Sequence, residues 1–166
     1  MVVRISKILL CLSLAAYVLI VVYDNVVDYG TNFTFVAHVM SMDTTLPDSV
    51  LRSRAINNPA IWHAAYWVII AAEAVTCLLL LLGAWRLWQA RAASSAQFNK
   101  AKDAAIMGAT DGILVWFAAM MIVGGEWFSM WQSATWNGQA PAARIYLTFI
   151  GILIYLNQND GDLVDA

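Results

Sequence analysis

Long stretches without charge constrain this chain more than any other feature. Charged side chains make up only 12% of its 166 residues, whereas 61% are hydrophobic, and most charges fall between apolar runs. A soluble chain of this length cannot bury so much apolar surface in one core, but a lipid bilayer can solvate it. The sequence therefore predicts an integral membrane protein formed by a single domain, residues 1–166.

Four apolar runs are long enough to cross a bilayer. They cover about residues 5–27, 61–85, 104–130 and 142–156. The last is the shortest, and at ~1.5 Å per residue its ends must snorkel to reach both surfaces. Because backbone polar groups in lipid must be satisfied within the protein, each run predicts a helix. The expected fold class is all-α, an integral membrane four-helix bundle.

The connection between the first two spans, residues 28–60, is expected to be partly helical and extracytoplasmic. Its first part is rich in apolar residues, as if it rests on the membrane surface or caps the helices. Pro47 and Asp48 are typical of a helix start, with Pro in the first turn and an acid near the positive end of the dipole. Asn58 followed by Pro59 predicts the N-terminal cap of the second span.

The first apolar run is predicted to be a retained span rather than a cleaved signal peptide. Arg4 and Lys7 precede it, as in a signal peptide, but Tyr23-Asp24-Asn25 follows where a small-x-small cleavage site belongs.

The distribution of basic residues predicts that both termini are cytoplasmic. Six lie on the side of the termini, against three on the other: Arg4, Lys7, Arg86, Arg91, Lys100 and Lys102, against Arg52, Arg54 and Arg144. Cytoplasmic segments carry the excess of Lys and Arg. The acidic C-terminal tail (Asp160, Asp162 and Asp165) contains no basic residue and adds nothing to this assignment.

Tryptophans mark the expected water boundaries. Interfacial aromatic belts place their rings at headgroup level. On the outer side the belt is formed by Trp62, Trp67, Trp127, Trp131 and Trp136, and Trp85 and Trp88 close the second span at the other side.

Two carboxylates fall deep inside the predicted spans. Glu73 lies 11 residues past Trp62, or ~16 Å inward, and Asp111 lies 8 residues past Asp103, or ~12 Å inward. They have similar depths and no Lys or Arg near them. We therefore expect them to face the protein interior, where they either act as a proton or cation relay or fix the helix register through hydrogen bonds.

A second polar group is expected at the outer headgroup level. It comprises Asp24, His63, Glu126 and Arg144, and a short loop joins the helices of the last two. Such a polar cap either seals the helices through ion pairs or forms a ligand mouth or proton entry point.

Small residues indicate where helices touch. Gly108 and Gly112 lie one turn apart on the third span, which permits close backbone approach to a neighbouring helix. Packing within the chain is the simpler interpretation, and self-association is the alternative.

Several classes of site are disfavoured by the sequence. Cys11 and Cys77 lie within apolar spans, and no cysteine and histidine spacing suits a metal. Haem ligation needs two histidines at one depth on facing helices, whereas His38 lies in the connection. We therefore expect no metal, no cofactor and no nucleic-acid partner.

Several short strings resemble a bacterial family of predicted small integral membrane proteins, catalogued as a domain of unknown function (family 2165). They are Ile61-Trp62-His63-Ala64-Ala65-Tyr66-Trp67, Gly83-Ala84-Trp85-Arg86, Gly124-Gly125-Glu126-Trp127-Phe128, Met130-Trp131-Gln132-Ser133 and Trp136-Asn137-Gly138-Gln139. The resemblance implies the bacterial inner membrane and supplies no functional residues.

Three functions remain open at this stage. A structural or accessory subunit, self-associating or part of a larger membrane complex, is favoured by the small size and smooth Ala and Gly faces. A small proton- or cation-coupled transporter or channel using Glu73 and Asp111 is the alternative. An enzyme is disfavoured because the sequence contains no nucleophile–base pair or cofactor motif.

Overall fold

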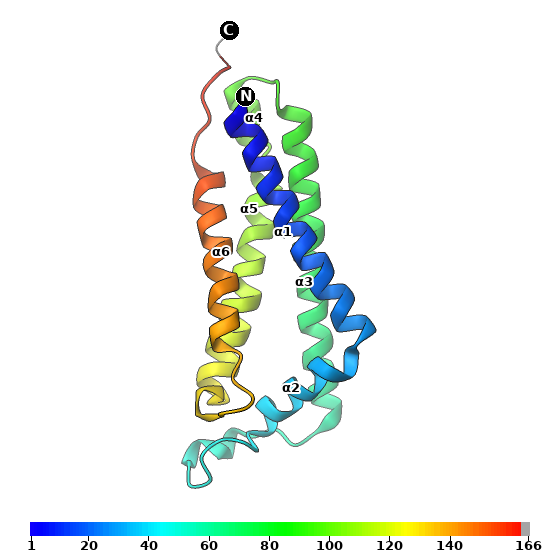
Figure 1. Cartoon of the computed structure of the whole chain (residues 1–166), viewed down its shortest axis with the longest axis vertical. Coiled ribbons are helices and arrows are strands. Elements are labelled where there is room, and N and C mark those ends of the chain that lie inside the picture. Colours follow the sequence, from blue (N-terminus) through cyan, green and yellow to red (C-terminus); the bar gives the residue numbers. More distant parts are fainter. Residues whose placement is uncertain (164–166) are drawn as a thin grey trace.

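The computed structural model describes residues 1–163, and that part of the chain is helical and contains no strand. Four of its helices are long and apolar enough to cross a membrane. They run side by side in Figure 1: α1 (Val2–Val27), α3 (Pro59–Ala90), a third helix composed of α4 (Ser95–Lys100), α5 (Asp103–Ile113) and the π-helix η2 (Leu114–Trp127), and α6 (Gln139–Asn157). The expectation of an all-helical fold with four helices long and apolar enough to span a membrane is confirmed.

The start of α1 and the end of α6 lie at the same end of the molecule, here named the terminal end (Figure 1). The opposite end is named the α2 end, because α2 (Tyr29–Ser41) lies across the helices there. Helix α3 packs against both α1 and α5, and α6 packs against α5, η2 and α1.

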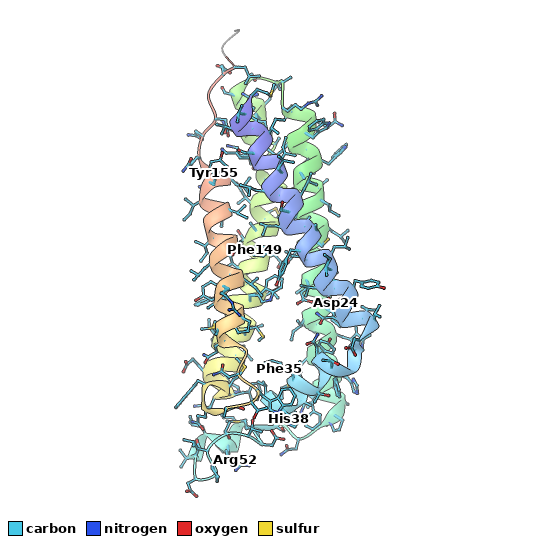
Figure 2. The ribbon with its side chains drawn as sticks, viewed as in Figure 1. Asp24, Phe35, His38, Arg52, Phe149 and Tyr155 are labelled. Carbon is cyan, nitrogen blue, oxygen red and sulfur yellow. The ribbon has the colours of Figure 1, made fainter. Side chains whose placement is uncertain are left out.

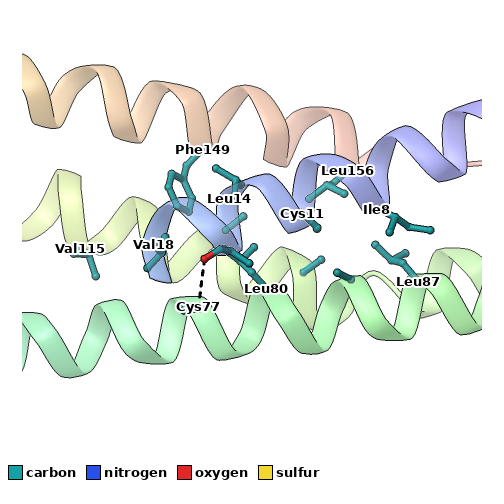
Figure 3. Close-up of a cluster of buried hydrophobic side chains, with 14 of the residues drawn as sticks. Ile8, Cys11, Leu14, Val18, Cys77, Leu80, Leu87, Val115, Phe149 and Leu156 are labelled. Carbon is teal, nitrogen blue, oxygen red and sulfur yellow. Dashed lines mark hydrogen bonds between the residues drawn. The ribbon is translucent and has the colours of Figure 1, made fainter. Parts of the chain in front are cut away.

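The main core lies between the four long helices on the side of the terminal end. Figure 3 shows Leu80 of α3 among side chains of α1 and α6, including Cys11 and Phe149. All three are at most 1% exposed. The Cys77 thiol donates a hydrogen bond to the Ala15 carbonyl across 3.5 Å, which ties α3 to α1.

A second core fixes α2 to the end of α3. Val36 and Met40 of α2 pack with Tyr66 and Ile70 of α3, and Met130 from the segment after η2 joins them. The connection between the first two spans is therefore partly helical. Its second helix is a 3-10 turn, η1 (Val50–Arg54).

Two helix starts show how local sequence sets the boundaries. The Asn58 side chain accepts a hydrogen bond from the Ala60 amide at 3.0 Å, with Pro59 in the first turn, so the predicted cap of the second span is confirmed. The helix start expected at Pro47 and Asp48 instead falls at Val50. There the Ser49 hydroxyl accepts the Leu51 amide and caps the 3-10 turn.

The third helix ends at Trp127, three residues before the predicted limit of residue 130. Ser129 has a φ of 52°, a left-handed conformation that a helix cannot continue through. Met130–Gln132 then form the 3-10 turn η3. The apolar run crosses this break because Phe128 and Met130, which follow the end of the long helix, are buried in the core at the α2 end.

Candidate functional site

Glu73 lies inside the protein and has a hydrogen-bond partner on the neighbouring helix. Its side chain is 4% exposed, and its Oε2 accepts a hydrogen bond from Nδ2 of Asn25 in α1 at 2.7 Å. The asparagine is also buried, at 6% exposed. A neutral donor thus replaces the basic partner that the sequence lacks at this depth.

The Asn25 amide is held in turn by two further donors. Its Oδ1 accepts from Nδ2 of Asn32 in α2 at 2.6 Å and from the Tyr66 hydroxyl at 3.2 Å. Asn32 is exposed at the α2 end, so a line of polar side chains leads from the surface to the buried Glu73. It joins three helices, α1, α2 and α3.

Asp111 makes a separate contact. Its Oδ2 accepts a hydrogen bond from the Thr76 hydroxyl of α3 at 2.8 Å, and the side chain is partly buried. Thr76 lies three residues after Glu73, or ~4.5 Å further along α3. Among the described residues no hydrogen bond joins the two carboxylates: Glu73 connects α3 to α1, and Asp111 connects α3 to α5.

The expected outer polar cap does not form an ion-pair network. Asp24, His63, Glu126 and Arg144 are all exposed. The ion pairs within residues 1–163 are those of Lys7 and Lys102 with Asp160, and His38 is hydrogen-bonded to Asp43. The short loop therefore brings the helices of Glu126 and Arg144 together without pairing the side chains.

His63 is instead part of an aromatic stack on α2. Its Nδ1 and the Tyr29 hydroxyl are hydrogen-bonded at 2.7 Å, and its ring lies 4.0 Å from that of Phe33. His38 stacks on Trp136 at 4.5 Å, so this tryptophan connects α2 to the loop before α6. Asp24, labelled near the end of α1 in Figure 2, is exposed.

The other predicted belt residues divide into two groups. Trp67, Trp127 and Trp131 are each slightly more than half exposed, which suits contact with lipid headgroups. The Trp62 indole donates a hydrogen bond to the Ile56 carbonyl at 2.6 Å and is partly buried, so it serves the α2 end of the fold.

Gly108 and Gly112 are both used within the chain. A β-carbon on Gly108 would lie 2.9 Å from the backbone nitrogen of Leu80 in α3. A β-carbon on Gly112 would overlap the ring of Phe149 in α6. One glycine therefore permits the α3–α5 contact and the other the α5–α6 contact.

A charged cluster at the terminal end was missed by the sequence analysis. Asp160 Oδ2 accepts from the ammonium groups of Lys7 at 2.6 Å and Lys102 at 2.5 Å. Both lysines also donate to the Gln158 carbonyl, and all three charged side chains are almost fully buried. Burial alone would raise the pKa of Asp160, but the hydrogen bonds and charges of the two lysines hold it below its usual value.

Arg4 extends this cluster, which we name the terminal lock. Only 2% exposed, Arg4 donates to the carbonyl oxygens of Arg91, Ala93 and Gly161 at 3.1, 2.6 and 3.0 Å. Nearby, Asp162 accepts from the Ser95 amide at 2.7 Å, and that hydrogen bond lowers the Asp162 pKa. The terminal lock thus holds the segment after α6 against α1 and the α3–α4 turn. Asp165 lies outside the described residues.

A lateral cleft of about 260 Å³ lies between α2, α3 and η2. Its lining is apolar and includes the small residues Ala65, Ala119 and Gly124. Its η2 wall is π-helical, and the Phe128 amide bonds the Val123 carbonyl five residues back at 3.0 Å. Such wider turns occur often at functional sites.

Within residues 1–163 no group of three or more His, Cys, Asp or Glu is placed to hold a metal.

Comparison with known proteins gives a single result. A family model described as predicted small integral membrane protein (DUF2165) matches residues 3–159. No curated protein and no solved structure gives a significant match.

Proposed function

We propose that this chain, which belongs to the family of predicted small integral membrane proteins, is an accessory or self-associating membrane subunit and not an enzyme. The observation that carries the proposal is the lateral cleft. It lies between α2, α3 and η2, its walls are apolar, and two residues of its lining, Val68 and Val123, are exposed, so the cleft opens at the surface of the molecule. Small residues and a π-helical segment at this place suit the insertion of side chains from a further transmembrane helix.

The terminal lock also favours a binding role over conduction. Two buried lysines pair with one buried carboxylate at this end, and the buried Arg4 lies beside them on backbone carbonyls, so the buried side chains here carry a net positive charge. A cation or proton that moved from Glu73 toward the terminal end would have to pass these charges. Opening that route in one protomer would also break several hydrogen bonds made by the segment after α6.

We further propose that the terminal end faces the cytoplasm of a bacterial inner membrane. Arg86 and Lys100 are exposed at that end and supply positive charge beside the terminal lock. Excess basic residues on short segments mark the cytoplasmic side. The α2 end, with its half-exposed tryptophans, then faces the outside.

A bulky substitution inside the cleft tests the binding role. Ala65→Phe fills the cleft from α3, whereas Ala64→Phe places the same ring on an exposed position of the same helix turn. Both variants are purified in mild detergent, and stoichiometric partners and oligomeric mass are measured by light scattering and mass spectrometry. We expect the wild type and Ala64→Phe to retain a partner protein or second copy and Ala65→Phe to lose it. A monomeric wild type without a partner, or equal retention by both variants, would contradict the proposal.

A second candidate, a proton- or cation-coupled transporter, has one observation in its favour. Asn25 and Asn32 connect the buried Glu73 to the surface at the α2 end. This candidate requires that Glu73→Gln and Asp111→Asn abolish flux in proteoliposomes while the protein still folds. Absence of flux in the wild type as well as in the double variant removes it.

A further inference from the structure

A groove of about 330 Å³ runs between α1 and α6, apart from the lateral cleft. Arg144 and Tyr17 line it together with apolar side chains of both helices, among them Leu14, Phe149 and Ile152. Arg144 lies five residues into α6 from the α2 end, and Ile152 eight residues further. The groove therefore extends for ~12 Å along α6, from near headgroup depth toward the membrane middle.

Arg144 carries the only charge among the residues that line this groove, and no carboxylate accompanies it. Within residues 1–163 its guanidinium makes no ion pair and donates no hydrogen bond to the protein. The Tyr17 hydroxyl likewise has no protein hydrogen-bond partner among these residues, and 41% of the tyrosine is exposed. A cation at the edge of the hydrocarbon is costly without a counter-ion, so this end of the groove favours an anion.

The groove wall is held by aromatic contacts. The Tyr17 ring lies 6.2 Å from that of Trp116, whose ring lies 5.4 Å from that of Phe149. Trp116 and Phe149 are buried, and the Phe149 ring is fixed against Gly112. The apolar wall is thus positioned by the packing of α5 and η2 against α6 rather than by a ligand.

We propose that this groove binds an anionic phospholipid, with its phosphate against Arg144 and an acyl chain between α1 and α6. The polar and apolar parts of the groove follow one another in the same order as the headgroup and chain of a lipid in that leaflet. Arg forms charge-assisted hydrogen bonds with phosphate oxygens, and Tyr17 supplies a further donor at the headgroup. The apolar lining contacts the acyl chain and so adds binding free energy that a free phosphate ion, which has no such chain, does not gain.

Lipid retention measured by native mass spectrometry tests this assignment. The protein is purified in mild detergent and exposed to phosphatidylglycerol, to phosphatidylcholine, or to inorganic phosphate alone. Three variants are compared with the wild type: Arg144→Gln, which removes the cation; Ser13→Phe, which fills the groove from α1 and changes no charge; and Arg52→Gln. Arg52 is a matched control because it lies in the connection at the α2 end but outside the groove (Figure 2).

We expect the wild type and Arg52→Gln to retain phosphatidylglycerol about fivefold or more above phosphatidylcholine. Arg144→Gln should lose this preference, and Ser13→Phe should retain less of both lipids. If Arg144→Gln does not fold, Ser13→Phe decides the question, since it replaces an exposed side chain. The proposal would be overturned if the wild type retained both lipids equally, or if the two arginine variants lost lipid equally. Unchanged retention by Ser13→Phe would also overturn it, as would displacement of lipid by inorganic phosphate at equal concentration.

Discussion

The terminal lock gives the most quantitative prediction, because one carboxylate balances two buried lysines. Asp160→Asn keeps the shape of the side chain and removes its charge. Lys7 and Lys102, with side chains 1% and 3% exposed, would then remain buried without a counter-ion. Breaking a buried pair in this way costs ~3–5 kcal/mol. We expect about 3 kcal/mol, the lower end, because both ammonium groups keep the Gln158 carbonyl as an acceptor.

The free energy of unfolding is measured in detergent micelles with increasing denaturant and helical circular dichroism as the signal. Asp162→Asn is the matched control: this aspartate is exposed and accepts a hydrogen bond from the Ser95 amide, so we expect a much smaller loss of stability than in Asp160→Asn. Replacing Lys7, Lys102 and Asp160 together by Met, Met and Leu should recover most of the stability lost in Asp160→Asn. Equal effects of Asp160→Asn and Asp162→Asn would refute the reasoning.

The pH dependence of the terminal lock has a defined sign. The pKa of Asp160 is lower in the folded protein than its usual value, so the folded state binds its proton less readily than the unfolded state. Its stabilisation is therefore complete above the unfolded pKa of ~3.9 and is lost as the pH falls through the folded pKa. Wild-type stability should decrease in this acidic window, and Asp160→Asn should show a smaller decrease.

Three further predictions concern the spans. Gly112→Ala should destabilise the protein by ~1–3 kcal/mol in the same unfolding assay, because the added methyl group overlaps Phe149. Gly151 has open space around it, so Gly151→Ala should be nearly neutral. Glu73→Gln should be tolerated, because its amide oxygen can accept a hydrogen bond from Asn25. Glu73→Ala should lower the free energy of unfolding by ~1–3 kcal/mol, because it leaves that buried donor unpaired. Equal losses of stability in the two variants would contradict the assigned hydrogen bond. A membrane-impermeant thiol reagent added outside should label Ser49→Cys and not Ser95→Cys, two positions of similar partial burial, and the opposite pattern would reverse the proposed orientation.

Hydropathy was sufficient to find the four long helices, since each apolar run of the required length must be helical in lipid. Local chemistry was sufficient for the Asn58 cap, because the capping side chain and the Ala60 amide that donates to it are two residues apart. The same approach failed at Ser129, where a left-handed residue interrupts an apolar run that hydropathy alone reads as continuous. Apolar character reports burial, whether in lipid or in a core, and does not distinguish a helix from a buried turn.

The partners of the buried polar groups could not be predicted, because they depend on how the helices are rotated and shifted against each other. The sequence marked Glu73 as deep in a span but did not identify Asn25, which is 48 residues away. Lys7 and Lys102 were interpreted as topology signals, Lys7 also as part of a signal-peptide-like start, and Asp160 only as part of the acidic tail. The available signal was a lysine within α1 one turn after Arg4, facing an acid just beyond α6, but this pairing spans 153 residues.

The distribution of these polar contacts indicates which part of the molecule can change shape. At the terminal end, buried charges tie α1, the α3–α4 turn and the segment after α6 together. At middle depth, α3 is joined to α5 by the close contact at Gly108 and the hydrogen bond of Asp111, and to α1 by the hydrogen bond of Glu73. Toward the α2 end, α3 and η2 instead border the apolar lateral cleft. A partner helix that inserts there would meet the least constrained pair of helices, so we expect binding to alter hydrogen exchange in η2 and the α2 end of α3 before it affects the terminal lock.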